Sequence, residues 1–121
     1  MTLKKHTSGV SAASFSPDGK TILTASFDKT AVIWNLNGKP ITIFQGHSGE
    51  INQAEFSSNG KFILTGSEDG TAKLWNIKGK LIKTFEEKYV TQYTAAIFSS
   101  DGQFAIVSSK DNNIDFWYLP K

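Results

Sequence analysis

The chain of 121 residues has the length of one ordinary domain, and its 39% hydrophobic and 20% charged residues suit a folded protein and argue against disorder. Thirteen basic and eleven acidic side chains leave a net charge of +2, which favours neither nucleic acid nor an anionic membrane as a partner. The absence of cysteine excludes disulfides, thiolate metal sites and a cysteine nucleophile, and no apolar run approaches the ~20 residues that span a bilayer.

The sequence repeats one unit three times. Five landmark residues recur at intervals of 41 and then 42 residues, and they are Phe15, Phe56 and Phe98; Gly19, Gly60 and Gly102; Ser26, Ser67 and Ser109; Asp28, Asp69 and Asp111; and Trp34, Trp75 and Trp117. The units 3–43 and 44–84 are identical at 18 of 41 positions, and the third, 85–121, has one extra residue between Phe85 and Phe98. We interpret residues 1–121 as a single domain built from these three repeats.

Each unit carries the pattern of short strands joined by tight turns. In the first unit, Ser16-Pro17-Asp18-Gly19 is a turn, because proline presets φ and glycine accepts a positive φ. In the second unit the pattern predicts four strands, Ile51–Phe56, Phe62–Ser67, Thr71–Asn76 and Leu81–Phe85. Four strands in about 41 residues predict an antiparallel meander of the length of one β-propeller blade. Six strand residues are expected to pack the blades together, namely Ala31, Ile33, Ala72, Leu74, Ile114 and Phe116.

Two segments carry a family resemblance. The segments "SFDKTAVIWN" and "GHSGEINQAEFSSNGKFILTGSEDGTAKLWN" resemble WD-repeat β-propeller blades, and the resemblance extends over essentially the whole chain. The dipeptide that names the family is relaxed here to Trp34-Asn35, Trp75-Asn76 and Trp117-Tyr118. The resemblance implies an all-β fold of four-stranded antiparallel blades, three in this chain.

Recurring histidine, serine and aspartate raise the question of a hydrolase, but the family resemblance implies a structural role. It implies a buried hydrogen-bond chain from tryptophan through serine or threonine and histidine to aspartate. The mapped residues are Trp34, Ser26, His6 and Asp28 in the first blade and Trp75, Ser67, His47 and Asp69 in the second. Each buried polar group would gain a partner, and the aspartate would fix the histidine tautomer.

The third blade departs from this pattern. Ser109, Asp111 and Trp117 are present, but the extra residue leaves either Lys88 or Tyr89 at the histidine position. We therefore expect an incomplete network, and the third blade is expected to be the weakest of the three.

Signals for other chemistry are absent from the sequence. There is no nucleophile-elbow motif, calcium loop or phosphate-binding glycine loop, and the two histidines belong to equivalent places on different blades. We expect no enzyme activity, no metal and no cofactor, and a soluble cytoplasmic protein with neither nucleic acid nor membrane as a partner.

Three blades do not close a ring, because rings typically contain 4–8 blades. The third blade also lacks a fourth strand, which the family usually supplies by pairing an N-terminal strand with the last blade. We expect Met1–Lys5 of one copy to pair beside Asn113–Leu119 of the next, so that a dimer forms six blades or, as second choice, a trimer forms nine. The alternative is that the chain is part of a larger propeller.

The resemblance implies a rigid scaffold for protein or peptide partners. Their contact positions would lie on the face around the channel mouth, at Gly9, Ser11, Phe27, Glu50, Asn52, Glu68, Gln92, Thr94 and Lys110. Phe27 stands out as an aromatic residue at a loop position, although packing within its own turn would also explain it. The competing interpretation is a designed, ancestral-type or fragmentary propeller module with no partner beyond itself.

Overall fold

A computed structural model describes residues 2–86, 93–109 and 114–120 of the chain. Sheet 1 contains β1 (Val10–Phe15), β2 (Thr21–Ser26), β3 (Ala31–Asn35) and β4 (Pro40–Phe44). Sheet 2 contains β5 (Ile51–Phe56), β6 (Phe62–Ser67), β7 (Thr71–Asn76) and β8 (Leu81–Glu86). Sheet 3 contains β9 (Tyr93–Phe98), β10 (Phe104–Ser109) and β11 (Ile114–Tyr118).

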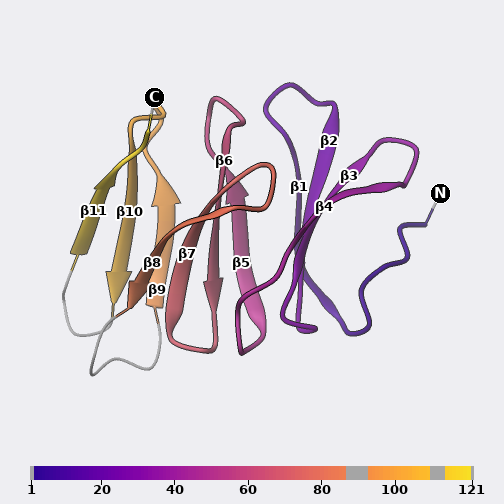
Figure 1. Cartoon of the computed structure of the whole chain (residues 1–121), viewed down its shortest axis with the longest axis horizontal. Helices are drawn as coiled ribbons and strands as arrows, with labels where there is room; N and C mark the ends of the chain where they lie inside the picture. The colour runs from indigo at the N-terminus through magenta and orange to yellow at the C-terminus, as the bar shows by residue number, and fades with distance from the viewer. Residues whose placement is uncertain (1, 87–92, 110–113, 121) are drawn as a thin grey trace.

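The three sheets are antiparallel meanders that stand side by side in chain order (Figure 1). Within each sheet every strand pairs with its neighbour in sequence, so the order is β1-β2-β3-β4, β5-β6-β7-β8 and β9-β10-β11. The all-β prediction and the four strands predicted for the second unit are confirmed, with β8 one residue longer than expected. Whether the sheets belong to a closed ring stays a prediction.

Turn chemistry sets the strand ends. Gly19, Gly60 and Gly102 have φ values of 72°, 73° and 75°, so the left-handed conformation expected at Gly19 recurs in the other two units. The relaxed tryptophan dipeptide also has a physical basis, because the Asn35 side-chain oxygen accepts hydrogen bonds from the backbone N–H groups of Asn37 and Lys39, both at 2.9 Å. The amide oxygen of this side chain therefore closes the turn between β3 and β4.

The core lies between the sheets. We call the face of a sheet that meets the next sheet along the chain its forward face, and the opposite one its rear face. One apolar cluster joins sheets 1 and 2, and its members are Leu23, Ala25, Ala31, Ile33, Phe44, Ile51, Ile63 and Trp75. A second joins sheets 2 and 3, and its members are Phe62, Leu64, Ala72, Leu74, Phe85, Ala96, Ala105, Val107 and Leu119. Only sheet 2 is covered on both faces by other described sheets.

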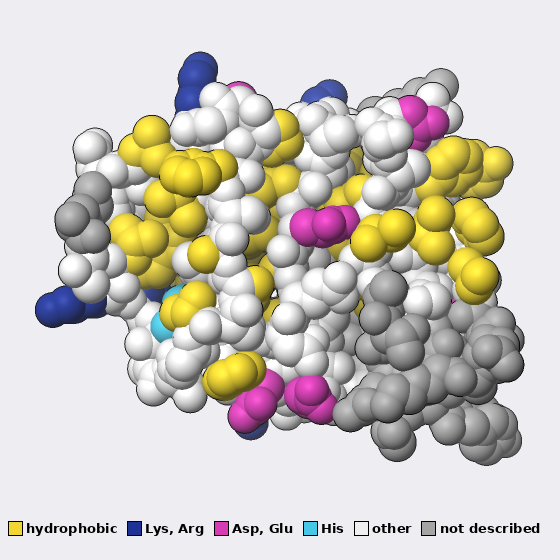
Figure 2. Space-filling view, turned by 180° about the vertical axis from the view of Figure 1, so that it is seen from behind, with side chains coloured by type: hydrophobic (Ala, Val, Ile, Leu, Met, Phe, Trp, Pro, Cys, Tyr) yellow, Lys and Arg dark blue, Asp and Glu magenta, His cyan; other side chains and the backbone are white. Residues whose placement is uncertain are grey.

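Ile114 and Phe116 do not pack in a core as expected. They occupy the positions in β11 that Ala72 and Leu74 occupy in β7, but they are 59% and 64% exposed. The reason is that they lie on the forward face of sheet 3, which no further sheet covers among the described residues. Figure 2 shows hydrophobic side chains gathered toward both ends of the row of sheets.

Side chains of sheet 2 also form hydrogen bonds with the backbone of sheet 3. The Glu55 carboxylate accepts a hydrogen bond from the backbone N–H of Phe98 at 2.7 Å, and the Gln53 amide donates to the carbonyl of Ala96 at 3.1 Å. Burial raises the pKa of Glu55, while the Phe98 N–H partly offsets this by favouring the charged form. These two bonds link β5 of sheet 2 to β9 of sheet 3.

Candidate functional site

The turn between β2 and β3 is built from the Ser-x-Asp-x-Thr sequence. The backbone N–H of Asp28 donates to the Ser26 hydroxyl at 3.0 Å, and the Thr30 hydroxyl and backbone N–H donate to Asp28 Oδ1 at 2.6 and 2.9 Å. Between them Lys29 has a φ of 77°, where the second repeat has Gly70 at 86°. These local bonds hold the Asp28 carboxylate so that its second oxygen faces the N-terminal segment.

His6 completes a chain of hydrogen bonds through the interior of sheet 1. The indole N–H of Trp34 donates to Thr24 Oγ1 at 2.8 Å, and that hydroxyl is 2.7 Å from His6 Nε2. On its other side, His6 Nδ1 is 2.8 Å from Asp28 Oδ2. Because the carboxylate only accepts, the neutral ring carries its proton on Nδ1, and the Thr24 hydroxyl donates to Nε2.

Sheet 2 contains the same chain of hydrogen bonds. Trp75 Nε1 donates to Thr65 Oγ1 at 3.0 Å, Thr65 Oγ1 is 2.7 Å from His47 Nε2, and His47 Nδ1 is 2.9 Å from Asp69 Oδ2. The His47 side chain is fully shielded from solvent, and Thr65 is fully buried. The same four residue types thus occupy equivalent positions in both sheets.

The prediction that Ser26 and Ser67 bridge tryptophan and histidine was wrong. The hydroxyl between tryptophan and histidine belongs to Thr24 and Thr65, which lie two residues before Ser26 and Ser67 on the same strand face. Ser26 instead donates to the carbonyl of Gly9 at 2.8 Å, and Ser67 donates to the carbonyl of Gly49 at 3.0 Å. These serines tie the turn to the loop that precedes the first strand.

In sheet 3 the chain of hydrogen bonds is interrupted at the position of Thr24 and Thr65. Val107 stands where Thr24 and Thr65 stand, and the indole N–H of Trp117 is buried without a hydrogen-bond partner among the described residues. Asp111, Lys88 and Tyr89 lie outside the described residues, as does the side chain of Ser109. The sequence pattern predicted an incomplete network at the histidine position, and the structure shows a further interruption at Val107.

Hydrogen bonding dominates the electrostatics of the two aspartates. Although burial by itself raises the pKa of the Asp69 carboxyl, hydrogen bonds from Thr71, His47 and the backbone of Ser48 lower it to about 2. The pKa of Asp28 is lowered to about 2 by the equivalent contacts. Burial lowers the pKa of His47, against the opposing effect of the Asp69 carboxylate. A neutral imidazole beside a charged carboxylate stabilises the turn, and the buried threonine hydroxyl is not accessible as a nucleophile.

Stability should fall in two steps as the pH is lowered. The unfolded chain protonates His47 more readily than the folded one, so stability decreases as the pH falls below 6.5. The aspartates bind protons less readily when folded, so stability is also lost as the pH falls from 3.8 to about 2, by about 1–2 kcal/mol for each once solvent screening of these partly exposed groups is allowed for. Urea unfolding at pH 7.5, 5.5 and 3 measures both steps. Asp69→Asn should make the acidic step smaller by the share of Asp69, leaving that of Asp28, and Glu50→Gln should not; equal profiles for the two variants would contradict the assignment.

The expected partner-contact residues differ in how far they are exposed to solvent. Ser11 is half-buried, and its hydroxyl donates to the carbonyls of Ile51 and Ala25, so it links β1 to β5 and to β2. Phe27 lies against Gly9, where an added Cβ would be 3.2 Å from its ring, yet the side chain is 42% exposed. The ring therefore packs partly within its own loop, and its contact with a partner stays a prediction.

The remaining described positions are exposed. Glu50, Asn52 and Glu68 are exposed beside the β6–β7 turn, where the Asn52 amide donates to Glu68 Oε1 at 2.7 Å. Gln92 and Lys110 lie outside the described residues, and the side chain of Thr94 is not described. No cluster of three or more histidine, aspartate and glutamate side chains that could hold a metal ion occurs within the described ranges.

Comparison with known proteins gives the family. Residues 1–35, 38–76 and 79–118 each match the repeat described as WD40 (WD domain, G-beta repeat), and the chain belongs to this family. WD40 repeat proteins generally act as protein-interaction scaffolds, and the fold is typically non-catalytic. No described helix is long and apolar enough to cross a membrane.

Two curated proteins match one part of the chain each. Over 46 residues, 37% of this chain, the identity to the Notchless protein homolog of Arabidopsis thaliana is 48%. Over 36 residues, 30% of this chain, the identity to Protein HIRA of Dictyostelium discoideum is 53%. The matched stretches span 10% and 3% of the length of those relatives.

Proposed function

We propose that the chain is a non-enzymatic WD-repeat scaffold that binds protein or peptide partners at the face bearing the β2–β3 and β6–β7 turns. One observation carries this proposal: the histidines and aspartates at this face are bonded to one another, whereas an aromatic ring and two carboxylate side chains face solvent beside them. A buried network lends rigidity, and exposed side chains on a rigid turn make suitable contact residues.

The chemistry of this face selects a kind of partner. Phe27 offers apolar area on sheet 1, while Glu50 and Glu68 give the adjacent turn of sheet 2 an acidic character. A segment that places an apolar side chain next to lysine or arginine would match both features. Aromatic residues also contribute strongly to binding when a partner buries them.

Selection from a displayed peptide library tests this binding face. The immobilised chain should enrich peptides with an apolar–basic pattern, and Phe27→Ala or Glu50→Gln should each weaken their binding by about tenfold. Lys39→Ala, in the turn at the opposite end of the strands, is the matched control and should have no effect. The proposal fails if no peptide is enriched, or if the enriched peptides bind the Phe27→Ala variant as well as the unchanged chain.

We also propose that the ends of the row are covered by head-to-tail association of identical chains. Val10 and Phe15 on the rear face of sheet 1 are exposed, while the equivalent Ile51 of sheet 2 is fully buried against sheet 1. On the forward face of sheet 3, Phe116 is exposed, while the equivalent Leu74 is fully buried. Each end thus repeats an apolar face that another sheet covers elsewhere in this chain.

A dimer would provide six blades and a trimer would provide nine, and the dimer is our first choice. In this proposal the N-terminal segment of one chain pairs with the edge of β11 in the next, where no strand lies beside β11 among the described residues. The alternative is a structural module with no other partner, or coverage of both ends by further blades of a larger propeller. We also propose that the protein is located in the cytoplasm.

A further inference from the structure

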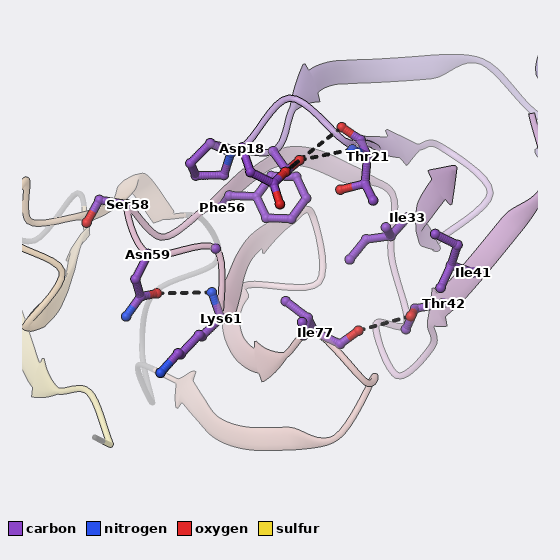
Figure 3. Close-up of a pocket in the computed structure, with 13 residues that line it drawn as sticks. Asp18, Thr21, Ile33, Ile41, Thr42, Phe56, Ser58, Asn59, Lys61 and Ile77 are labelled. Atoms are coloured by element: carbon purple, nitrogen blue, oxygen red, sulfur yellow. Dashed lines mark hydrogen bonds between the residues drawn. The ribbon is translucent and has the colours of Figure 1, made fainter. Parts of the chain in front are cut away.

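An open groove lies between sheets 1 and 2, at the end of the strands opposite the proposed binding face. Its volume is about 600 Å³, and Figure 3 shows side chains from both sheets pointing into it. The walls are largely apolar: Ile33 and Ile41 come from sheet 1, and Phe56 and Ile77 come from sheet 2. The β1–β2 and β5–β6 turns form its rim.

The next junction shows what fills this space when the repeat is complete. The lining position Thr21 in β2 corresponds to Phe62 in β6, and both begin the second strand of their sheet on its forward face. Phe62 is buried in the cluster between sheets 2 and 3, against the counterparts of the groove walls. The groove between sheets 1 and 2 is therefore the place of a missing aromatic ring.

The side chains around Thr21 are more exposed than those around Phe62, as expected if the groove lacks an aromatic ring. Ile77 of the groove is 39% exposed, whereas its counterpart Leu119 is 9% exposed beside Phe62. Ile41 is 56% exposed, whereas its counterpart Ile82 is partly buried. The apolar walls remain accessible because threonine is too short to cover them.

The polar groups of the groove do not favour a charged ligand. Asp18 and Lys61 place one negative and one positive charge at the rim. Asn59 Oδ1 accepts from the backbone N–H of Lys61 at 3.0 Å, and the Thr42 hydroxyl donates to the carbonyl of Ile77 at 3.0 Å. The charges balance and these polar atoms are occupied, which suits an uncharged apolar occupant.

We propose that this groove binds an aromatic side chain presented by a peptide segment of a partner protein, in the place that Phe62 occupies at the next junction. The ring packs against Phe56 and the isoleucine side chains, and aromatic pairs add stabilisation beyond the area that they bury. The site is separate from the face that carries Phe27, so one partner can be held at both ends of the blades.

The test uses the full chain, labelled with ¹⁵N, and the capped tripeptides acetyl-Gly-Phe-Gly-amide and acetyl-Gly-Ala-Gly-amide. The phenylalanine peptide should bind in the millimolar range and shift the amide signals of Lys61 and Ile77, and the alanine peptide should bind about tenfold more weakly or not at all. Thr21→Phe fills the groove and should abolish these shifts, while Thr21→Ser leaves it open and should preserve them.

The proposal is overturned if the phenylalanine peptide produces no shift at these amides, or if Thr21→Phe binds it as well as the unchanged chain. It is also overturned if these signals move with protein concentration alone and Thr21→Phe stops the movement, because the occupant is then a second copy. The reciprocal variant Phe62→Thr covers the case in which Thr21→Phe does not fold. It should open an equivalent groove and add peptide-induced shifts at Gln103 and Leu119.

Discussion

At micromolar concentration the chain is expected to scatter light as a species of about 27 kDa, twice the 13.3 kDa of one chain. The reason is the apolar area at both ends of the row, where Phe15 and Phe116 are exposed although their internal counterparts pack against a neighbouring sheet. A species of about 40 kDa would select the trimer of nine blades instead.

A charged residue at one end of the row of sheets should dissociate this oligomer into monomers. Phe116→Asp places a carboxylate on the forward face of sheet 3, on its edge strand β11, and it should leave a species of about 13 kDa because burying an unpaired charge is costly. Leu81→Asp, on the outer strand of sheet 2 and away from both ends, is the matched control. A monodisperse monomer of the unchanged chain would contradict head-to-tail association and favour coverage of the ends by further blades of a larger protein.

Thr65→Val should destabilise the fold by about 2–4 kcal/mol, although the two side chains have nearly the same shape. The change removes the acceptor of the Trp75 indole N–H and the donor to His47 Nε2, and each buried group left without a partner costs about 1–3 kcal/mol. Urea unfolding monitored by tryptophan fluorescence measures the difference in the free energy of unfolding.

Thr84→Val is the matched control, because Thr84 is only half-buried and its hydroxyl accepts a single bond from the Lys73 ammonium at 3.1 Å. It should change stability by about 0.5 kcal/mol or less. Equal losses at the two positions would contradict the importance of the buried chain. The reverse change Val107→Thr in sheet 3 should be neutral or stabilising, because it offers the Trp117 indole N–H an acceptor.

The strands and turns were predictable because each is specified locally and repeated. A turn such as Ser16-Pro17-Asp18-Gly19 fixes both neighbouring strand ends, and the intervals of 41 and 42 residues carry the same boundaries along the chain. The members of the buried network were predictable only in part. Thr24 and Ser26 lie on the same face of one strand, and spacing alone does not decide which hydroxyl reaches the indole.

The structural roles of two residues could not be predicted from the sequence alone. Val107 interrupts the network and Thr21 opens the groove, and both substitutions are visible in the aligned sequence. Their meaning required knowing which face of the strand each residue occupies and what it would contact there. Similarly, the exposure of Ile114 depends on the absence of a neighbouring sheet, which no local pattern records.

The coverage of sheet 2 on both faces has a consequence for how the chain opens. In a row of units that contact only their neighbours, the central unit gains two interfaces and each outer unit gains one. Local unfolding therefore begins at sheets 1 and 3 and reaches β6, whose residues are all buried, only when the whole row separates. Sheet 2 is the cooperative centre of the molecule, and a second copy docked at either end would extend that protection outward.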